Sequence, residues 1–186
     1  MPRDVHILWK CYSRAEDYIY MSFSKMIKQK GNTDEWYTPR HAVELILPYA
    51  KGKVWCPFDT DDSYFPKVFR ENGIECENTH ISTGYDFFEY EPATYDCIIS
   101  NPPYSKRQAV LERLYKLGKP FAMLLNMNGI FDEKSRFELF KVGGVQMFVP
   151  NGRIKFFQDE GNIKSSPNFQ SIYVCRNLLP KDIVFE

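Results

Sequence analysis

The sequence has no excess of charge of either sign. Its 186 residues hold 24 Lys and Arg against 24 Asp and Glu, so the formal net charge is zero. A neutral chain has no overall field that would draw it onto a polyanion. This balance argues against an architectural protein that wraps a DNA duplex. Any contact with nucleic acid must come from basic side chains gathered on one face.

The sequence also lacks the cysteine patterns of metal sites and disulfide frameworks. Its five cysteines are spread along the chain, at Cys11, Cys56, Cys76, Cys97 and Cys175. No two of them, and no Cys with a His, have the spacing of zinc ligands. An odd number of scattered cysteines is typical of free thiols in a reducing compartment. We therefore expect a cytoplasmic protein with neither a bound metal nor disulfides.

Long hydrophobic runs and phosphate-binding glycine loops are missing as well. No segment approaches the roughly 20 apolar residues that a membrane helix needs, and the N-terminal segment lacks the apolar stretch of a signal peptide. We expect no membrane partner. Neither GxGxxG nor GxxxxGK[ST] occurs, which argues against a nucleotide-handling enzyme built on a phosphate loop.

Aromatic residues are abundant, at 16% of the chain with 15 Phe and 12 Tyr. Most of them belong in a core, but the excess also suits a site that stacks on planar bases. The length predicts one domain with an arm. Residues 1–33, which mix aromatic and basic residues, are the arm, and residues 34–186 are the domain. A short helix over 14–29 and a frayed terminus are both compatible with the arm.

Apolar runs alternate with amphipathic segments along residues 34–186. We expect helices starting at Thr38-Pro39 and over 63–72, 106–117 and 133–140. We expect strands over 53–56, 74–81, 95–100, 121–125, 145–149, 153–157 and 171–175. This alternation predicts an open α/β sheet with helices on both faces, and the last two strands should pair antiparallel at one edge because no helix separates them. Ligands of such sheets bind outside the carboxyl ends of the strands.

The tetrapeptide Asn-Pro-Pro-Tyr at residues 101–104 directly follows one of these expected strands. The Asn101 side chain offers an acceptor oxygen. The two prolines have no N–H and stiffen the turn, so the backbone there presents carbonyl acceptors. The Tyr104 ring can stack on a planar base. The motif therefore suits a flipped-out adenine or cytosine held by its amino group, although a plain proline-rich turn is the simpler interpretation.

Together with three further segments, this motif resembles the adenine-specific amino-methyltransferases that use S-adenosylmethionine. Residues 37–39 (Tyr-Thr-Pro) resemble the family's segment ahead of the first strand. Residues 56–59 (Cys-Pro-Phe-Asp) resemble its "DPF" segment, and residues 84–88 resemble its "DF" segment. The resemblance runs from about residue 34 to 175. Residues 152–157 also resemble a late family segment that helps to enclose the target base.

The resemblance implies a mostly parallel, seven-stranded Rossmann-like methyltransferase sheet with an antiparallel edge strand. It implies methyl transfer from S-adenosylmethionine to the N6 amine of adenine in DNA. The catalytic residues it implies are Asn101, Pro102, Pro103 and Tyr104. The cofactor-binding residues it implies are Tyr37, Thr38, Pro39, Pro57, Phe58, Asp59, Asp86, Phe87 and Asn101. We expect Tyr104, Lys106, Arg107 and Phe156 to bind the substrate, with Phe157 as a further stacking ring. Lys106 and Arg107, right beside the motif, are the candidates for phosphate contacts.

The cofactor loop departs from the family pattern. Residues 59–63 contain three aspartates and no glycine, although the family has glycines there that let the backbone approach the cofactor. Two interpretations of the aspartates are compatible with each other: they serve the amino group and ribose of the cofactor, and they form an acidic helix start, with Asp61 or Asp62 as the cap. For the ribose, Glu75 and Glu77 are candidates and Asn78 and His80 are rivals.

The domain leaves little chain for target recognition, apart from the arm and the loop over 158–168. We therefore expect a protein partner or a second copy to supply it, and the small size suits an enzyme of a phage or mobile element. Two other functions stay open. One is methylation of adenine in tRNA or rRNA, and the other is an inactive, cofactor-binding accessory subunit.

Overall fold

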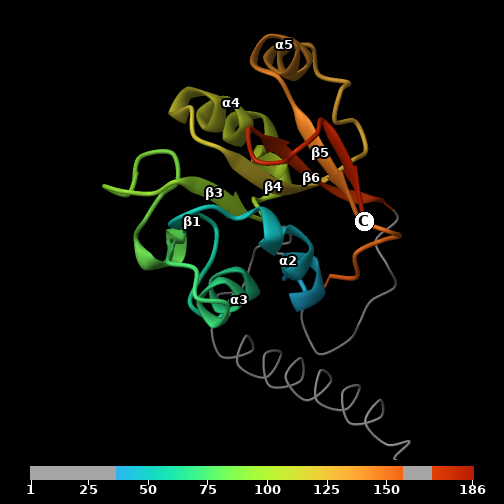
Figure 1. Ribbon diagram of the computed structural model, residues 1–186. Helices are drawn as coiled ribbons and strands as arrows, with labels where there is room; N and C mark the ends of the chain where they lie inside the picture. Colours follow the sequence, from blue (N-terminus) through green and yellow to red (C-terminus); the bar gives the residue numbers. More distant parts are fainter. Residues whose placement is uncertain (1–36, 157–168) are drawn as a thin grey trace, which may run out of the picture.

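The computed structural model describes residues 37–156 and 169–186 (Figure 1). The expected helix over 14–29 and the loop over 158–168 lie outside the described residues. The described part forms one sheet of seven strands in the order β2-β1-β3-β4-β6-β5-β7. The strands are β1 (Val54–Cys56), β2 (Cys76–Asn78), β3 (Cys97–Ser100), β4 (Phe121–Asn126), β5 (Gln146–Val149), β6 (Ser171–Arg176) and β7 (Ile183–Phe185).

Strands β2, β1, β3 and β4 run parallel, β6 runs antiparallel to both β4 and β5, and β7 pairs parallel with β5. The fold is therefore the open, mostly parallel, Rossmann-like α/β sheet that the sequence predicts. The helices are α2 (Arg40–Ile46), α3 (Tyr64–Glu71), α4 (Arg107–Leu117) and α5 (Lys134–Gly143). Short 3-10 turns occur at Leu47–Tyr49, Ile81–Thr83 and Tyr104–Lys106.

The sheet is covered on both faces. Figure 1 shows α2 and α3 below the strands and α4 and α5 above them. Successive strand residues point to opposite faces: Val54 and Cys56 belong to the core under α2 and α3, whereas Trp55 belongs to the core under α4 and α5. Because both faces are buried, the central strands are continuously apolar, which makes them recognisable in the sequence.

The helix ends follow local signals, with shifts of a residue or two. Gly118, in the left-handed conformation, ends α4 as expected. Pro39 is the N-cap of α2, and not its first residue as the sequence predicts, and no side chain caps this helix. Ser63 is the N-cap of α3, so the expectation that Asp61 or Asp62 caps this helix is wrong.

Two of the expected strands differ in the structure. Residues 153–156 are irregular, so the expected strand over 153–157 is wrong over its described part. Ile154 and Phe156 are instead buried in the core beneath α2 and α3. The expected strand over 74–81 is shorter, because only Cys76–Asn78 pairs with β1.

Strand β6 lies between two antiparallel partners, β4 and β5. Six residue pairs join it to β4, from Phe121 with Arg176 to Asn126 with Ser171. The expected hairpin between 153–157 and 171–175 therefore does not form. The sequence analysis also missed β7, whose three residues are too few to give a periodic pattern and include the exposed Ile183 and Phe185.

Gly52 fixes the entry into β1. Its φ is +60°, and a Cβ there would collide with the Asp96 carboxylate, which accepts a hydrogen bond from the Lys53 N–H at 2.7 Å. We expect Gly52→Ala to lower the free energy of unfolding by about 2–3 kcal/mol, through left-handed strain plus displacement of Asp96. Urea denaturation measures this loss.

Gly73→Ala is the matched control, because Gly73 has a φ of +72° but a Cβ added there would meet no other atom within 4 Å. It should lose only the backbone strain, about 1–2 kcal/mol. Equal losses in the two variants would contradict a role for the contact with Asp96.

Candidate functional site

The carboxyl ends of β1 and β3 form the point where the chain reverses its direction of travel across the sheet. From β1 the chain passes through α3 to β2 on one side, and from β3 it passes through α4 to β4 on the other. Helices α3 and α4 lie on opposite faces (Figure 1). In open α/β sheets this switch point is where ligands bind. The segments after Cys56 and after Ser100 flank it.

A hydrogen bond joins these two segments. The Ser100 hydroxyl, at the end of β3, donates to Asp59 Oδ2 at 2.5 Å, and Asp59 lies three residues beyond the end of β1. The structure thus brings residues 57–59 next to the Asn-Pro-Pro-Tyr motif, as the sequence predicts.

The motif turns the chain from a buried strand into a helix. Pro102 is buried, whereas Asn101 and Tyr104 are half-buried. Pro103 has extended backbone (φ −60°, ψ 124°) and caps the 3-10 turn that leads into α4. The Pro103 carbonyl accepts a hydrogen bond from the Lys106 N–H at 3.1 Å. The backbone of Asn101 is therefore anchored on both sides, at the end of a central strand.

Phe87 brings the third predicted segment to the same edge. Its ring lies 4.8 Å from that of Phe58 and 5.5 Å from that of Trp55, between ring centroids. Phe87 is buried and Phe58 half-buried, so Phe58 is the outer ring of this aromatic cluster. Asp86 Oδ1 accepts a hydrogen bond from the Phe88 N–H at 2.9 Å. A carboxylate has capacity for further donors beyond this one.

Arg113, on α4, holds this segment in place and was missed by the sequence analysis. Its guanidinium donates to the carbonyls of Phe88 and Tyr90, at 2.9 and 3.0 Å, and lies 5.4 Å from the Phe87 ring. These partners are distant in the sequence, so only the tertiary structure shows this contact.

Asp59 is the most unusual group of the site. It is 5% exposed, and the described residues place no cation beside it. Burial raises its pKa from 3.8 to about 7, and hydrogen bonds from Ser100 and Ser63 oppose part of this rise. The sequence predicts Asp59 as a cofactor contact, but the structure places its carboxyl inside the fold.

The other acidic residues near the cofactor loop have basic partners. Asp61 pairs with Arg70 at 3.1 Å, and Asp62 pairs with Lys67 at 3.6 Å. The Asn78 Oδ1 also accepts a hydrogen bond from Arg70. The two carboxylates therefore pair with basic side chains of α3 but do not cap it, since Ser63 is its N-cap.

The two glutamates considered for the ribose do not lie at the carboxyl end of β2. Glu75 precedes the strand, and both Glu75 and Glu77 pair with Lys53, at 3.5 and 2.9 Å. Because β2 ends at Asn78, the rivals Asn78 and His80 are the residues at the correct edge.

The remaining predicted site residues occupy different environments. Thr38 and Pro39 are buried, and Tyr37 packs against the core beneath α2 and α3. Phe156 is 2% exposed and belongs to that same core. Phe157 lies outside the described residues. The ring nearest to Tyr104 among those described is instead Phe169, at 5.9 Å between centroids, a residue that the sequence analysis did not select.

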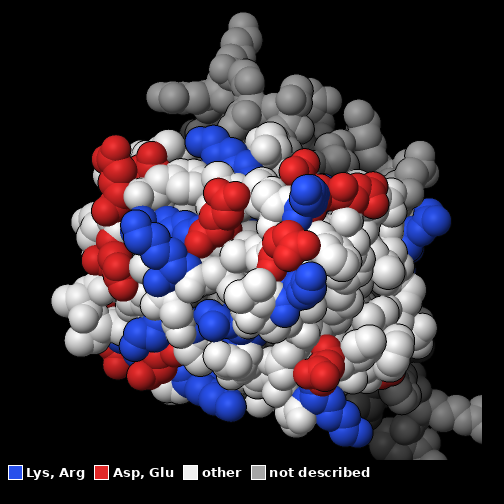
Figure 2. Space-filling view, turned by 90° about the horizontal axis from the view of Figure 1, so that it is seen from above, with Lys and Arg blue, Asp and Glu red and all other residues white. Residues whose placement is uncertain are grey.

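The two basic residues after the motif differ in their surroundings. Lys106 is exposed, with its Nζ 5.5 Å from the Phe88 ring centroid. The Arg107 guanidinium donates to the carbonyls of Asn126, Asn128 and Gly129, at 3.1–3.4 Å. Arg107 therefore orders the loop after β4, and Lys106 is the better placed of the two for a phosphate. On the face seen in Figure 2, basic and acidic side chains are interspersed.

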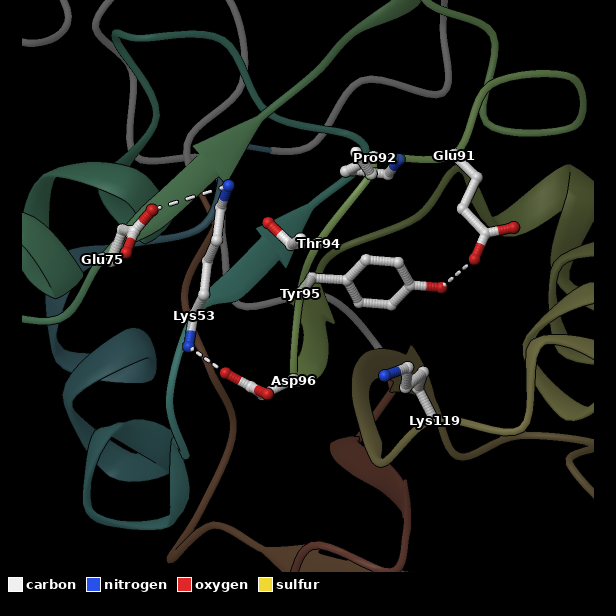
Figure 3. Close-up of a pocket in the computed structure, with 9 residues that line it drawn as sticks. Lys53, Glu75, Glu91, Pro92, Thr94, Tyr95, Asp96 and Lys119 are labelled. Carbon is white, nitrogen blue, oxygen red and sulfur yellow. Dashed lines mark hydrogen bonds and ion pairs between the residues drawn. The ribbon is translucent and has the colours of Figure 1, made fainter.

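A pocket of about 480 Å³ lies at the opposite, amino edge of the sheet (Figure 3). Several of its polar groups have partners within the pocket: Lys53 pairs with Glu75, and the Tyr95 hydroxyl donates to Glu91 at 2.6 Å. The Nζ of Lys119 lies 5.3 Å from the Tyr95 ring centroid. Because ligands of open α/β sheets bind at the carboxyl ends of the strands, we place the site at the Asn-Pro-Pro-Tyr edge despite this cavity.

Metal clusters and membrane-spanning helices are both absent from the described residues. No group of three or more His, Cys, Asp or Glu residues there is arranged to hold a metal ion. None of the described helices has the length and hydropathy to cross a membrane.

Comparison with known proteins finds similarity of fold among solved structures. No protein-family model matches the chain, and no curated protein matches it in sequence. Among solved structures, it is similar to the methyltransferase subunit of the type I restriction-modification system from Streptococcus thermophilus, with 12% identity and a TM-score of 0.49. The match covers 80% of this chain and 46% of that chain, so the chain spans less than half of that protein.

Proposed function

We propose that this chain transfers a methyl group from S-adenosylmethionine to the exocyclic N6 amine of adenine in DNA. The observation that carries the proposal is the position of the Asn-Pro-Pro-Tyr motif. It lies at the carboxyl end of β3, at the switch point of the sheet, and is linked to the loop after β1 through Ser100 and Asp59. This is where a base held by the motif would meet a cofactor bound beyond β1.

The residues at this edge fit the cofactor. Phe58 offers a half-exposed ring for an adenine, and Asp86 retains acceptor capacity for its amine. Tyr37, Thr38 and Pro39, before α2, are assigned to the methionine moiety. Phe87, which is buried, packs against the Phe58 ring, and Pro57 is buried next to Phe58 in the chain. When bound, the cofactor supplies a methyl group on a positively charged sulfur.

The chain's own residues prepare the target amine. The adenine N6 is a weak nucleophile because its lone pair is delocalised into the ring. The Asn101 carboxamide oxygen and the Pro102 carbonyl accept hydrogen bonds from the two N–H groups of the amine. These bonds favour a more tetrahedral nitrogen. Tyr104 stacks on the base, an interaction worth about 1–3 kcal/mol. Catalysis is then mainly positioning and electrostatic stabilisation, without a covalent intermediate on the protein.

A second candidate is an inactive accessory subunit that retains the fold. The observation that favours it is the cofactor loop, which lacks glycine and whose Asp61 and Asp62 are paired with basic residues of α3. The intact catalytic motif favours an active enzyme. RNA remains the alternative substrate, because the same acceptors and stacking ring would hold adenine in either nucleic acid.

One experiment separates these functions. The protein is incubated with methyl-labelled S-adenosylmethionine and with double-stranded DNA, single-stranded DNA or RNA, and calorimetry measures cofactor binding. We expect label in N6-methyladenine of DNA. Label in RNA alone would move the substrate to RNA. Cofactor binding without label on any substrate would support the inactive subunit, and the absence of both would overturn the proposal.

Lys106 should contribute to affinity for the DNA backbone. We expect Lys106→Gln to weaken binding several-fold for all sequences alike and to reduce the slope of log affinity against log salt by about one. Lys116→Gln is the control, because Lys116 is exposed at the far end of the same helix. Fluorescence anisotropy at several salt concentrations measures both variants. Equal losses of DNA affinity in the two variants would show that Lys106 has no specific role in contacting the DNA backbone.

A further inference from the structure

The Asp59 side chain and backbone join four elements around the switch point. Asp59 follows β1, and its carboxyl bonds to Ser100 at the end of β3 and to Ser63 at the start of α3. Its N–H donates to the Thr79 carbonyl at 3.1 Å, just after β2. Its own carbonyl accepts from Asn78 Nδ2 at 3.3 Å. Asp59 therefore connects the loop without glycine to all four elements.

Burial favours the neutral form of the Asp59 carboxyl more than the hydrogen bonds from Ser100 and Ser63 favour the charged form. Among the described residues, the polar groups near it are the Ser100 hydroxyl from β3, the Ser63 hydroxyl from α3, the Cys56 thiol from β1 and the Tyr173 hydroxyl from β6. None of these is a cation. Burial of an unpaired carboxylate is costly, so such groups hold a proton instead. A neutral carboxyl also donates one hydrogen bond and accepts others, which suits two serine partners.

Ser100 links Asp59 to Asn101 of the proposed reacting site. Ser100, which donates to Asp59 Oδ2, directly precedes Asn101 in the chain. Ionisation of Asp59 would strengthen the hydrogen bond that Ser100 donates, but it would also leave a buried charge that must be hydrated. Entry of water at the junction of β1, β3 and α3 would shift Ser100 together with Asp59, and with them the carboxamide of Asn101.

We propose that neutral Asp59 is a positioning residue, which acts through Ser100 to hold Asn101 in the geometry that binds the target amine, and that its ionisation moves Asn101 out of this geometry. The inference rests on the proposed function for its catalytic consequence. The expected midpoint is near neutral pH, because burial raises the pKa of Asp59 to about 7. Asp59 is thus not itself a catalytic residue.

The catalytic test is a pH profile of single-turnover methyl transfer. In the wild type the rate should fall about tenfold from pH 6 to pH 8, following the neutral fraction of one acid. Asp59→Asn keeps an acceptor for Ser100 but cannot ionise, so its profile should be flat over this range. Asp59→Ala removes the acceptor and should be slow at every pH. A profile of Asp59→Asn that falls like that of the wild type would overturn the proposal.

A test without catalysis uses the side-chain amide resonances of Asn101 in NMR spectra. In the wild type they should titrate with a midpoint near pH 7, and in Asp59→Asn they should not. Ser100→Ala should remove the titration, whereas the control Ser63→Ala should keep it, because Ser63 does not adjoin the motif. Titration that persists in Ser100→Ala or in Asp59→Asn would overturn the inference.

Thermal unfolding distinguishes the positioning role of Asp59 from the proposed function. Because the folded state holds Asp59 neutral while the unfolded state ionises above about pH 4, the wild type should lose stability relative to Asp59→Asn between about pH 4 and pH 7. The Tm gap should widen over that range and then stay constant. If the gap and the Asn101 titration appear but no substrate is methylated, the positioning holds and the proposed function fails. If substrate is methylated but neither the Tm gap nor the Asn101 titration is observed, the positioning role of Asp59 is wrong and the proposed function stands.

Discussion

Replacement of Asn101 by alanine should lower the rate of methyl transfer by about 10³-fold or more. The carboxamide oxygen is one of the two acceptors that the proposed mechanism uses to raise the nucleophilicity of the adenine amine. Loss of a single preorganised hydrogen-bonding group at a reacting centre typically reduces the rate by about 10²–10³-fold. Here the lost group also orients the base, so the larger end of this range is expected.

The fold should tolerate this substitution, because Asn101 lies just after the end of β3 and not within the strand. The neighbours Ser100 and Pro102 are buried and do not change. Cofactor binding, measured by calorimetry, should therefore stay within a few-fold of the wild-type value. Single-turnover transfer to an adenine-containing duplex measures the rate.

Asn128→Ala is the matched control. Asn128 is an exposed residue in the loop after β4, the next strand of the sheet, and its contact to Arg107 uses the backbone carbonyl. This variant should retain normal transfer. An Asn101→Ala protein that kept a rate within about tenfold of the wild type would show that the motif is a structural turn.

Replacement of Trp55 by alanine should reduce the free energy of unfolding by about 3–5 kcal/mol, the usual range for a fully buried tryptophan. Trp55 is fully buried in the middle of β1, and its indole N–H donates to Thr79 Oγ1 at 2.9 Å. Its ring contacts those of Phe87 and Tyr95, at 5.5 and 5.2 Å between centroids. Alanine would leave a cavity and an unpaired hydroxyl at the base of the site.

Chemical denaturation followed by circular dichroism measures this loss. Trp55→Phe keeps most of the ring packing and loses the N–H, so it should lose about 1–3 kcal/mol. Phe185→Ala, at an exposed position of β7, should change stability by no more than about 0.5 kcal/mol. Because Phe87 rests on Trp55, we also expect weaker cofactor binding in Trp55→Ala at a temperature where it is folded. Unchanged stability would contradict the role of Trp55 as the central side chain of this core.

Local chemistry was readable from the sequence. The apolar runs of β1, β3, β4 and β6 are visible because strands that are covered on both faces are apolar along their whole length. The end of α4 at Gly118 follows from backbone preferences that act within a few residues. The stiffness and the acceptors of the Asn-Pro-Pro-Tyr motif are properties of its own four residues, so they were predictable. Its place after a strand was predictable from the apolar run over 95–100.

Long-range pairing was not readable from the sequence. Residues 171–175 were correctly predicted as a strand, but β6 pairs with β4 and β5 and not with residues 153–157. A periodic pattern reports which side chains are buried and does not report which strand covers them. The short edge strand β7 gives no pattern at all.

The roles of polar side chains depended on the tertiary structure for the same reason. Arg107 was predicted to bind phosphate, yet its guanidinium is held by three carbonyls of the loop after β4. Asp59 was predicted as a cofactor contact, yet its carboxyl is buried against Ser100. The sequence by itself determined which groups are available at the site. Only the folded chain decided which are exposed and which are enclosed, because the protonation and the partners of a polar group depend on neighbours that are distant in sequence.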